Sequence, residues 1–294
     1  MIINAENSNN IDLDFLINIQ SCEINCCSHC QSTYFIKHGK TNNKQRYLCK
    51  DCQRTFSATT NTTLYHSRKP FDYWRKFIEL MFTSTSLRDC SNQLNINLKT
   101  AFSWRHKLLN ALKTITETVK LKDCIEMRKI FIRENNKGQK DKIENSGKKV
   151  WVIVSSDSND DTFAEPISVG FWRKNNFTKL VYSKIHKNSY INTFGDSYIR
   201  AISSTHNKNK VKKNNYGSKE LVYTFIGNIK GIISNCHGVA TKYLPHYFSL
   251  AKIISLSKKY SLSQLLNIIS NSNSYITNEK VRAMIPVYQP MMSH

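Results

Sequence analysis

Cys27-Ser28-His29-Cys30 and Cys49-Lys50-Asp51-Cys52 are two C-x-x-C pairs with eighteen residues between the inner cysteines. Two thiolates three positions apart fit on one tight turn and can present both sulfurs to one metal ion. Two such turns supply four ligands and complete a tetrahedral Zn²⁺ site. The stretch therefore predicts a zinc ribbon whose ligands are Cys27, Cys30, Cys49 and Cys52.

The segment between the pairs supports this interpretation, because Tyr34-Phe35-Ile36 and Gln45-Arg46-Tyr47-Leu48 are typical of the two strands of a β-hairpin. A disulfide framework is the alternative. However, the nine cysteines are an odd number, and the first residues begin no secretory signal. A reducing compartment favours metal over disulfides. Cys26 could compete with Cys27 for the metal.

The charge of the chain points to a polyanionic partner. Lys and Arg number 43 against 21 Asp and Glu, which gives a formal net charge of +22. Such a charge attracts nucleic acid and helps to hold it by counterion release. An AT-rich genome also raises the Lys and Asn content, but it should raise Asp and Glu as well, so the imbalance remains. No apolar run approaches the length of a membrane span, and we expect a soluble, cytoplasmic protein.

Three helices are predicted after the ribbon. Apolar residues at helical spacing predict the first over residues 71–82, directly after Pro70. Ser86 and Asp89 can cap the second, which runs to about Leu94, and the third continues to about Lys113. Two short helices joined by a tight polar turn outline a helix-turn-helix, although any three-helix bundle shows the same periodicity. The candidate DNA contacts, each of which could equally be a solvated residue, are Lys99, Thr100, Ser103, Arg105, His106 and Lys107.

The pattern changes near residue 121. Residues 124–132, 150–154 and 164–169 read as strands, and the later segments are more helical, which predicts an α/β core. The predicted fold class is therefore multidomain α/β: a zinc ribbon, a helix-turn-helix bundle and a mixed sheet with flanking helices. The predicted divisions are a leader (1–20), the ribbon (21–65), the helix-turn-helix (66–115), the core (120–257) and a helical tail (258–294).

Three strings in this chain resemble those of bacterial insertion-sequence transposases that carry an N-terminal zinc ribbon. They are the ribbon segment 45–56, the helical segment from Ser86-Leu87-Arg88 to residues 100–107, and Gly238-Val239-Ala240-Thr241-Lys242-Tyr243-Leu244 with the following Pro245-His246-Tyr247. The resemblance covers roughly residues 25 to 255. It implies that ribbon and helix-turn-helix bind DNA ends as a homo-oligomer at the nucleoid, and that an RNase-H-like core cuts and rejoins DNA. Further candidate DNA contacts are Arg46, Lys50, Arg54 and Lys242.

The resemblance also implies where catalytic residues should lie. Such cores hold two Mg²⁺ ions with acidic residues, sometimes completed by an asparagine, because Mg²⁺ prefers hard oxygen ligands. In this chain the three family positions fall on Arg128, Thr193 and Tyr223, and a guanidinium cannot ligate Mg²⁺. The remaining weak candidates for catalytic acids are Glu126, Asp157 and Asp196.

The leading hypothesis is a transposase-like DNA-binding protein with structural Zn²⁺, in which DNA cleavage and strand transfer are impaired. One alternative is an active, metal-dependent DNA transposase that uses the three acids in an unfamiliar arrangement, and only this alternative requires Mg²⁺. The other is a transcriptional regulator derived from a transposase, whose core serves for assembly.

Overall fold

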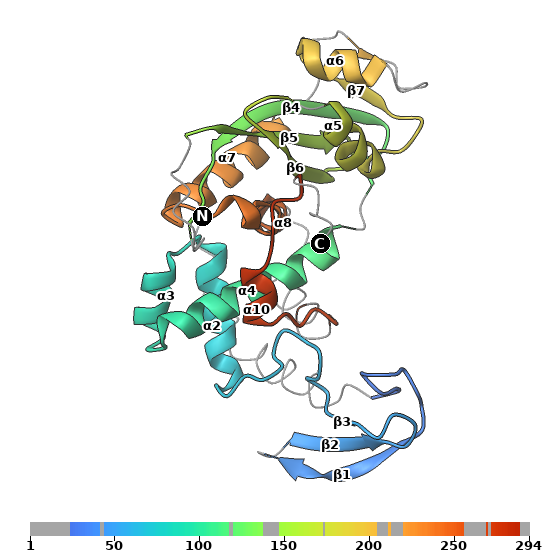
Figure 1. Cartoon of the computed structure of the whole chain (residues 1–294), viewed down its shortest axis with the longest axis vertical. Helices are drawn as coiled ribbons and strands as arrows, with labels where there is room; N and C mark the ends of the chain where they lie inside the picture. The colour runs from blue at the N-terminus through green and yellow to red at the C-terminus, as the bar shows by residue number, and fades with distance from the viewer. Residues whose placement is uncertain are drawn as a thin grey trace. The chain divides into compact units, whose positions relative to one another are not determined.

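The computed structural model describes residues 24–41, 44–117, 120–137, 147–172, 174–204, 211–212, 220–255, 269 and 272–288 (Figure 1). The chain divides into two compact units. The first comprises Met1–Arg75 with Lys259–Ile276, and the second comprises Lys76–Lys258 with Thr277–His294. The predicted leader, residues 1–20, lies outside the described residues. Within the described part of the chain, every helix is too short or too polar to cross a bilayer.

The first unit contains a small antiparallel sheet of order β1-β2-β3, with strands Phe35–Thr41, Lys44–Cys49 and Thr55–Phe56. The predicted β-hairpin between the cysteine pairs is thus present as β1 and β2. Phe35, Tyr47 and Phe56 form one aromatic cluster, with ring centroids 5.4–5.6 Å apart. The buried Cys27 and Cys49 belong to the same cluster, so the ribbon has only a small apolar core of its own.

The predicted helices are α2 (Phe71–Phe82), α3 (Leu87–Gln93) and α4 (Leu98–Thr116). The predicted cap of α3 is confirmed, because the Ser86 hydroxyl accepts from the Asp89 backbone N–H at 3.2 Å and donates to the Asp89 carboxylate at 2.6 Å. Asn97 caps α4 by accepting from the Lys99 N–H at 2.8 Å. A side-chain oxygen at this position satisfies a donor that the helix leaves unpaired.

The second unit is built on a five-stranded mixed sheet of order β6-β5-β4-β7-β8. Its strands are β4 (Cys124–Arg133), β5 (Lys149–Asp157), β6 (Thr162–Val169), β7 (Tyr190–Asn192) and β8 (Val211–Lys212). Strand β5 runs antiparallel to both of its neighbours, β4 and β6, whereas β7 runs parallel to β4 and β8 parallel to β7. The three long strands match the predicted ones.

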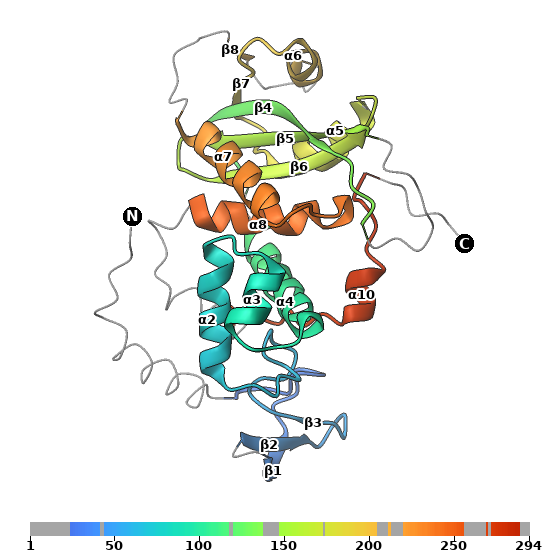
Figure 2. The ribbon, with the colours of Figure 1, turned by 90° about the vertical axis from the view of Figure 1, so that its left-hand side faces the viewer.

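Helices lie on both faces of this sheet (Figure 2). The face that carries Ile125 and Met127 forms a buried core with Phe177 and Val181 of α5 (Lys174–Val181), and Ile199 of α6 (Ser197–Ser204) joins it. Successive side chains alternate between faces, so Glu126 and Arg128 lie on the opposite face. There, α7 (Glu220–Asn235) contacts β4 and β5, and α8 (Leu244–Ser255) contacts β6.

The string that begins at Gly238 joins α7 to α8 and fixes this junction to the end of β4. The Asn135 backbone N–H donates to the Thr241 hydroxyl, and the Thr241 N–H donates to the Asn135 carbonyl, both at 2.8 Å. Gly238 has a φ of +94°, and a Cβ there would lie 2.9 Å from the Asn135 amide nitrogen. A side chain at this position would therefore meet both backbone strain and a clash.

The second unit combines two segments that the sequence predicted as separate domains. Helix α4 packs against α8, and the helical bundle from Lys76 onward belongs to the same compact unit as the sheet. Of the predicted helical tail, the structure describes Ile269 and residues 272–288, with one short helix, α10 (Asn278–Arg282).

Candidate functional site

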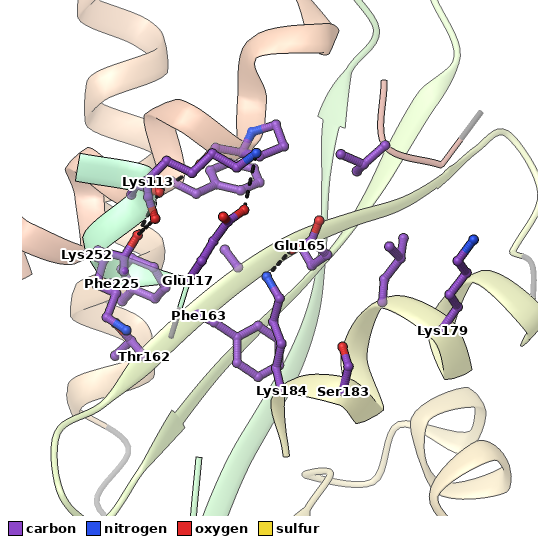
Figure 3. A pocket seen from close by; sticks show the side chains of 17 residues that line it. Lys113, Glu117, Thr162, Phe163, Glu165, Lys179, Ser183, Lys184, Phe225 and Lys252 are labelled. Carbon is purple, nitrogen blue, oxygen red and sulfur yellow. Dashed lines mark hydrogen bonds and ion pairs between the residues drawn. The ribbon is translucent and has the colours of Figure 1, made fainter. Parts of the chain in front are cut away.

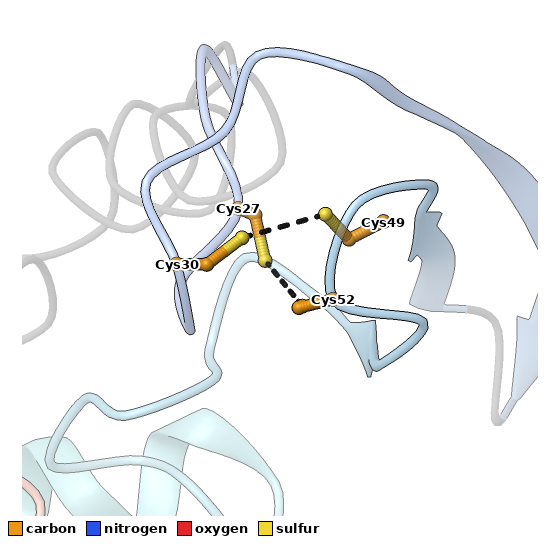
Figure 4. A group of neighbouring side chains, drawn as sticks. All are labelled: Cys27, Cys30, Cys49 and Cys52. Atoms are coloured by element: carbon orange, nitrogen blue, oxygen red, sulfur yellow. Dashed lines mark hydrogen bonds between the residues drawn. The ribbon is translucent and has the colours of Figure 1, made fainter.

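The four predicted zinc ligands converge on one point (Figure 4). The Sγ atoms of Cys27 and Cys52 are 3.7 Å apart, those of Cys30 and Cys49 are 3.6 Å apart, and all four lie within 4.8 Å of one another. A tetrahedral Zn²⁺ with Zn–S bonds of about 2.3 Å places its sulfurs about 3.8 Å apart. The sulfurs are free thiols, and the donor set fits zinc.

The two metal-binding turns have the same backbone design. The N–H of the first cysteine in each turn donates to a carbonyl five residues later: Cys27 to Ser32 at 2.8 Å and Cys49 to Arg54 at 3.0 Å. The residue after each turn has a positive φ, 64° at Gln31 and 57° at Gln53. Because both turns have the same backbone conformation, each presents its two sulfurs in the same way, and four ligands from two distant segments can meet at one point.

Local electrostatics favour the ligand form of Cys49. The backbone N–H of Cys52 lowers the pKa of the Cys49 thiol to about 7. The paired Cys30 thiol shifts the other way: although a backbone hydrogen bond from Ser32 opposes it, burial and the neighbouring thiols raise its pKa to about 12, so Cys49 is the first of the two to ionise. Cys26, which could have competed with Cys27, is not among the clustered sulfurs, and its thiol donates to the Gln31 side chain at 3.3 Å.

The start of α4 presents the accessible part of the predicted helix-turn-helix face. Lys99 is exposed, and Thr100 and Ser103 are half-buried. The preceding turn is fixed by the Ser91 hydroxyl, which donates to the Ile96 carbonyl at 2.6 Å. The helix therefore begins at a defined place and leaves these three side chains accessible.

Arg105, His106 and Lys107 do not form the exposed face expected of DNA contacts, because all three are buried in the second unit. Arg105 is 1% exposed, and its guanidinium donates to the Thr85 carbonyl at 2.6 Å and to the Met81 sulfur at 3.1 Å. It thereby joins α4 to α2 and to the α2–α3 turn. The expectation was wrong for these residues because a helical pattern identifies faces but not the segment that covers each face.

His106 is covered by aromatic rings, with its centroid 4.5 Å from that of Phe102 and 4.4 Å from that of Tyr243. Burial lowers the pKa of His106 to about 3, so this imidazole is neutral at physiological pH. Burial also lowers the pKa of Lys107 to about 8. These side chains serve the junction between α4 and the segment after α7.

The other predicted DNA contacts differ in their surroundings. Arg54 is exposed and Lys50 is half-buried. Arg46 donates to the Thr55 hydroxyl at 3.1 Å across the small sheet. Lys242 donates to the Arg282 carbonyl at 2.6 Å, so its ammonium group already has a partner within the second unit.

The resemblance implies catalytic residues at positions 128, 193 and 223, and residues at or beside these positions do lie close together on the sheet. The guanidinium carbon of Arg128 on β4 lies 4.0 Å from the ring centroid of Phe194 and 4.5 Å from that of Tyr223 on α7. We call these three residues the arginine stack. Cations within about 6 Å of an aromatic centroid are attracted to the ring face. Thr193 is buried beside the stack.

Phe194 was not predicted as part of this site. The Asp196 N–H donates to the Thr193 carbonyl at 3.0 Å, and the central residues of this turn, Phe194 and Gly195, have φ values of 48° and 85°. A phenylalanine with positive φ is strained by about 1–2 kcal/mol. Two successive positive φ angles are typical of a type I′ turn. The signal for such a turn in the sequence was Gly195, which follows Phe194 shortly after a short strand.

Glu126 lies two residues from Arg128 on the same face of β4 and pairs with Asn192 of β7 in the sheet. It is 7% exposed, and one of its carboxylate oxygens, Oε2, is buried without a hydrogen-bond partner. Burial raises the pKa of Glu126, and the charge of Arg128 opposes this shift only in part. The site therefore disfavours the ionised form that a metal ligand needs.

The other two candidate acids lie elsewhere. Asp157 pairs with Ile125 in the sheet, on the face opposite Glu126, and accepts backbone N–H groups from Lys122, Asn159 and Asp161 at 2.9–3.0 Å. Asp196 accepts from two N–H groups of the first turn of α6, and it pairs with Lys129 at 3.1 Å. Asp157 thus holds the turn between β5 and β6, and Asp196 caps α6, so both carboxylates already accept hydrogen bonds from the backbone. Among the described residues, only the four cysteines form a group of three or more potential ligands close enough for a metal ion.

A cavity of about 230 Å³ lies along edge strand β6, between α5 and α8 (Figure 3). Its lining contains two glutamates, and each is paired: Glu117 with Lys113 at 3.2 Å and Glu165 with Lys184 at 2.5 Å. Burial raises the pKa of Glu165, and Lys184 counteracts this. The lining offers no unpaired carboxylate to a metal.

Comparisons with known proteins agree with the resemblance found in the sequence. No protein-family model matches the chain. The chain is 29% identical over 117 residues to an uncharacterized protein in transposable element ISH50 of Halobacterium salinarum, a match that spans 38% of this chain and 38% of that protein. The chain thus resembles a protein of a transposable element, and the match covers well under half of either sequence.

One solved structure is a distant neighbour. A chain in the crystal structure of a pre-cleavage Mos1 transpososome aligns with a TM-score of 0.29 and 11% sequence identity, over 72% of this chain and 82% of that one. A likeness of this size carries no argument about the fold.

Proposed function

We propose that this chain is a transposase-like DNA-binding protein of insertion-sequence origin that binds DNA ends through its zinc ribbon and helix-turn-helix, and in which DNA cleavage and strand transfer are impaired. The observation that carries the proposal is the arginine stack. The Arg128 guanidinium lies against the rings of Phe194 and Tyr223, at a position where the family resemblance implies an acid that binds metal.

The sequence match to the ISH50 protein supports the insertion-sequence origin. The sheet supports the assignment of the core, because an order of β6-β5-β4-β7-β8, with three antiparallel strands followed by two parallel ones, is the topology of RNase-H-like cores. The three positions at which the resemblance implies catalytic residues fall here on Arg128 of β4, on Thr193 directly after β7, and on Tyr223 of α7.

The chemistry of the stack opposes metal binding. Two Mg²⁺ ions would need several carboxylate oxygens close together, but the acid two residues away on the same face of β4, Glu126, has an ionised form that is disfavoured by burial. The positive charge of Arg128 would repel the ions, and the aromatic rings offer no ligand. The core thus keeps its fold while its chemistry is replaced by cation–π packing.

Two surfaces support binding to duplex DNA. The start of α4 carries Lys99, Thr100 and Ser103, which matches the use of the N-terminal residues of a recognition helix. On the ribbon, edge strand β1 exposes Lys37, His38 and Lys40, and Arg54 is exposed near β3. Together with the net charge of +22, these residues favour a phosphate-dominated interaction.

DNA binding is tested by gel shift with element-like duplex ends and with random duplexes of equal length. We expect a preference for the ends and an affinity that falls steeply with salt. Lys99→Gln should weaken binding about fivefold and reduce the salt slope by about one. Lys230→Gln, on the exposed side of α7, is the matched control and should change neither value. Stepwise larger complexes would support binding as a homo-oligomer, and equal affinity for random DNA would refute sequence-selective binding.

Cleavage is tested with a supercoiled plasmid that carries the preferred end, in Mg²⁺ or Mn²⁺. We expect no nicked or joined product from the unmodified chain, and no change on Glu126→Gln, because within the described part of the chain Glu126 belongs to no group of three or more potential metal ligands. Glu279→Gln, on an exposed acid of α10, is the control. Metal-dependent nicking that Glu126→Gln abolishes and Glu279→Gln preserves would establish the active transposase instead.

A further inference from the structure

Four aromatic side chains form a continuous row on the α6 side of the five-stranded sheet. Phe131 of β4 lies opposite Trp151 of β5 in the ladder, Trp172 follows β6, and Tyr198 belongs to α6. Successive ring centroids are 6.1, 6.4 and 6.2 Å apart. We call Phe131, Trp151, Trp172 and Tyr198 the aromatic row.

Two lysines alternate with these rings. The Lys129 ammonium lies 5.3 Å from the centroids of both Trp151 and Trp172, and 4.5 Å from that of Tyr198. The Lys149 ammonium lies 4.8 Å from Phe131 and 5.9 Å from Trp151. Asp196 offsets the charge of Lys129 at 3.1 Å, whereas Lys149 stands on the exposed first position of β5.

The centre of the row is held rigid while its ends are open. The Trp151 indole N–H donates to the Gly170 carbonyl at 2.7 Å, and Trp172 packs against Phe177 of the core. By contrast, Phe131 is 50% exposed and Tyr198 is 57% exposed, and neighbouring Phe171 is 88% exposed. Packing against the core accounts for the positions of Trp151 and Trp172. It does not account for Phe131, Tyr198 and Phe171, whose large side chains are exposed to solvent.

The chemistry of this surface selects its ligand. Proteins that bind single strands combine aromatic rings, on which unpaired bases stack, with cations that neutralise the phosphates. A duplex keeps its base faces inside the helix and cannot use such rings. We propose that the aromatic row binds single-stranded DNA, with bases stacked on the open rings and phosphates beside Lys149. The choice of DNA over RNA rests on the proposed function, and the surface adds a single-strand site to the duplex-binding surfaces.

The natural tryptophans report on this binding. Trp74 and Trp104 are 1% and 4% exposed, so quenching of fluorescence by an added oligonucleotide would come mainly from Trp151 and Trp172. Titration with a twelve-nucleotide oligo-dT should quench the fluorescence saturably. The double substitution Phe131→Ala with Tyr198→Ala, which removes exposed side chains, should weaken this binding about tenfold. Tyr190→Ala, at a 40% exposed tyrosine of β7 outside the row, is the control and should bind as the unmodified chain does.

Charge and strand type are tested separately. Lys149→Gln should reduce the salt slope of oligo-dT binding, and Lys230→Gln should not. Absence of quenching, or quenching that the double substitution leaves unchanged, would overturn the inference, and tighter binding of the matching oligo-U would overturn its assignment to DNA. Gel shifts with duplex ends separate this site from the proposed function. If duplex binding fails while row-dependent oligo-dT binding persists, only the proposed function is lost.

Discussion

Replacement of Cys49 by serine should remove the zinc from this protein and unfold the ribbon. Its aromatic cluster of Phe35, Tyr47 and Phe56 is too small to hold three short strands by apolar burial alone. In structural zinc sites the metal contributes about 10–16 kcal/mol to folding, and the loss of one thiolate leaves an incomplete tetrahedral site. We therefore expect zinc content to fall from about one ion per chain to near zero.

The measurement combines elemental analysis for zinc with limited proteolysis of residues 24–56. Cys26→Ser is a closely matched control, since Cys26 is adjacent to Cys27 but lies outside the sulfur cluster. It should retain both the metal and the protease resistance. If Cys49→Ser kept a full complement of zinc, or if Cys26→Ser lost it, the assignment of the four ligands would have to be revised. Binding to duplex ends should weaken together with zinc loss if the ribbon contacts DNA.

The sequence predicted those parts of the structure that are set by local chemistry. The spacing of the cysteines placed four ligands together, and the Ser86–Asp89 pair placed the start of α3, because turns and caps depend on residues within one or two turns of the chain. The long strands were visible as apolar runs. By contrast, β7 has only three residues, too few to produce a recognisable period.

Parts of the site that depend on distant segments were harder to predict. The resemblance placed the three catalytic positions at Arg128, Thr193 and Tyr223. Residues at or beside these positions do lie close together. However, the ring that covers the Arg128 guanidinium from the turn after β7 belongs to Phe194 and not to residue 193. Gly195 is the one local sign of a turn here, and it does not indicate that the phenylalanine before it would also adopt a positive φ. The candidate acids were chosen by residue type. In the structure Asp157 holds the β5–β6 turn and Asp196 caps α6, both on the other side of the sheet from Glu126.

Arg105 is the sharpest case, because its burial follows from contacts with segments far away in the sequence. Its guanidinium lies 3.5 Å from the Cys236 sulfur and 3.7 Å from the Cys90 sulfur, in addition to its bond to the Thr85 carbonyl. Helical spacing alone could not distinguish a DNA-facing arginine from one that is covered by the end of α7. A buried Arg105 should contribute to the stability of the fold, whereas a DNA-facing arginine should not.

Arg105→Ala should destabilise the second unit by about 3–5 kcal/mol, because it leaves a large cavity and removes the guanidinium hydrogen bond from the part-buried Thr85 carbonyl, which keeps only a long contact from the Cys90 thiol at 3.9 Å. Arg105→Met restores most of the volume but not the hydrogen bonds, so it should cost less than alanine. The free energy of unfolding is measured by urea denaturation monitored by tryptophan fluorescence, to which the buried Trp104 of α4 contributes. Arg88→Ala, at an exposed arginine of α3, should change it by less than about 0.5 kcal/mol.

The same variants separate structure from DNA recognition. Under conditions in which Arg105→Met remains folded, its affinity for duplex ends should match that of the unmodified chain, because the buried guanidinium cannot reach a phosphate or a base edge. Lys99→Gln should show the reverse, with reduced affinity and unchanged stability. An Arg105→Met protein that is fully stable but binds DNA tenfold more weakly would mean that Arg105 is a DNA contact after all, and that α4 exposes it when DNA is bound.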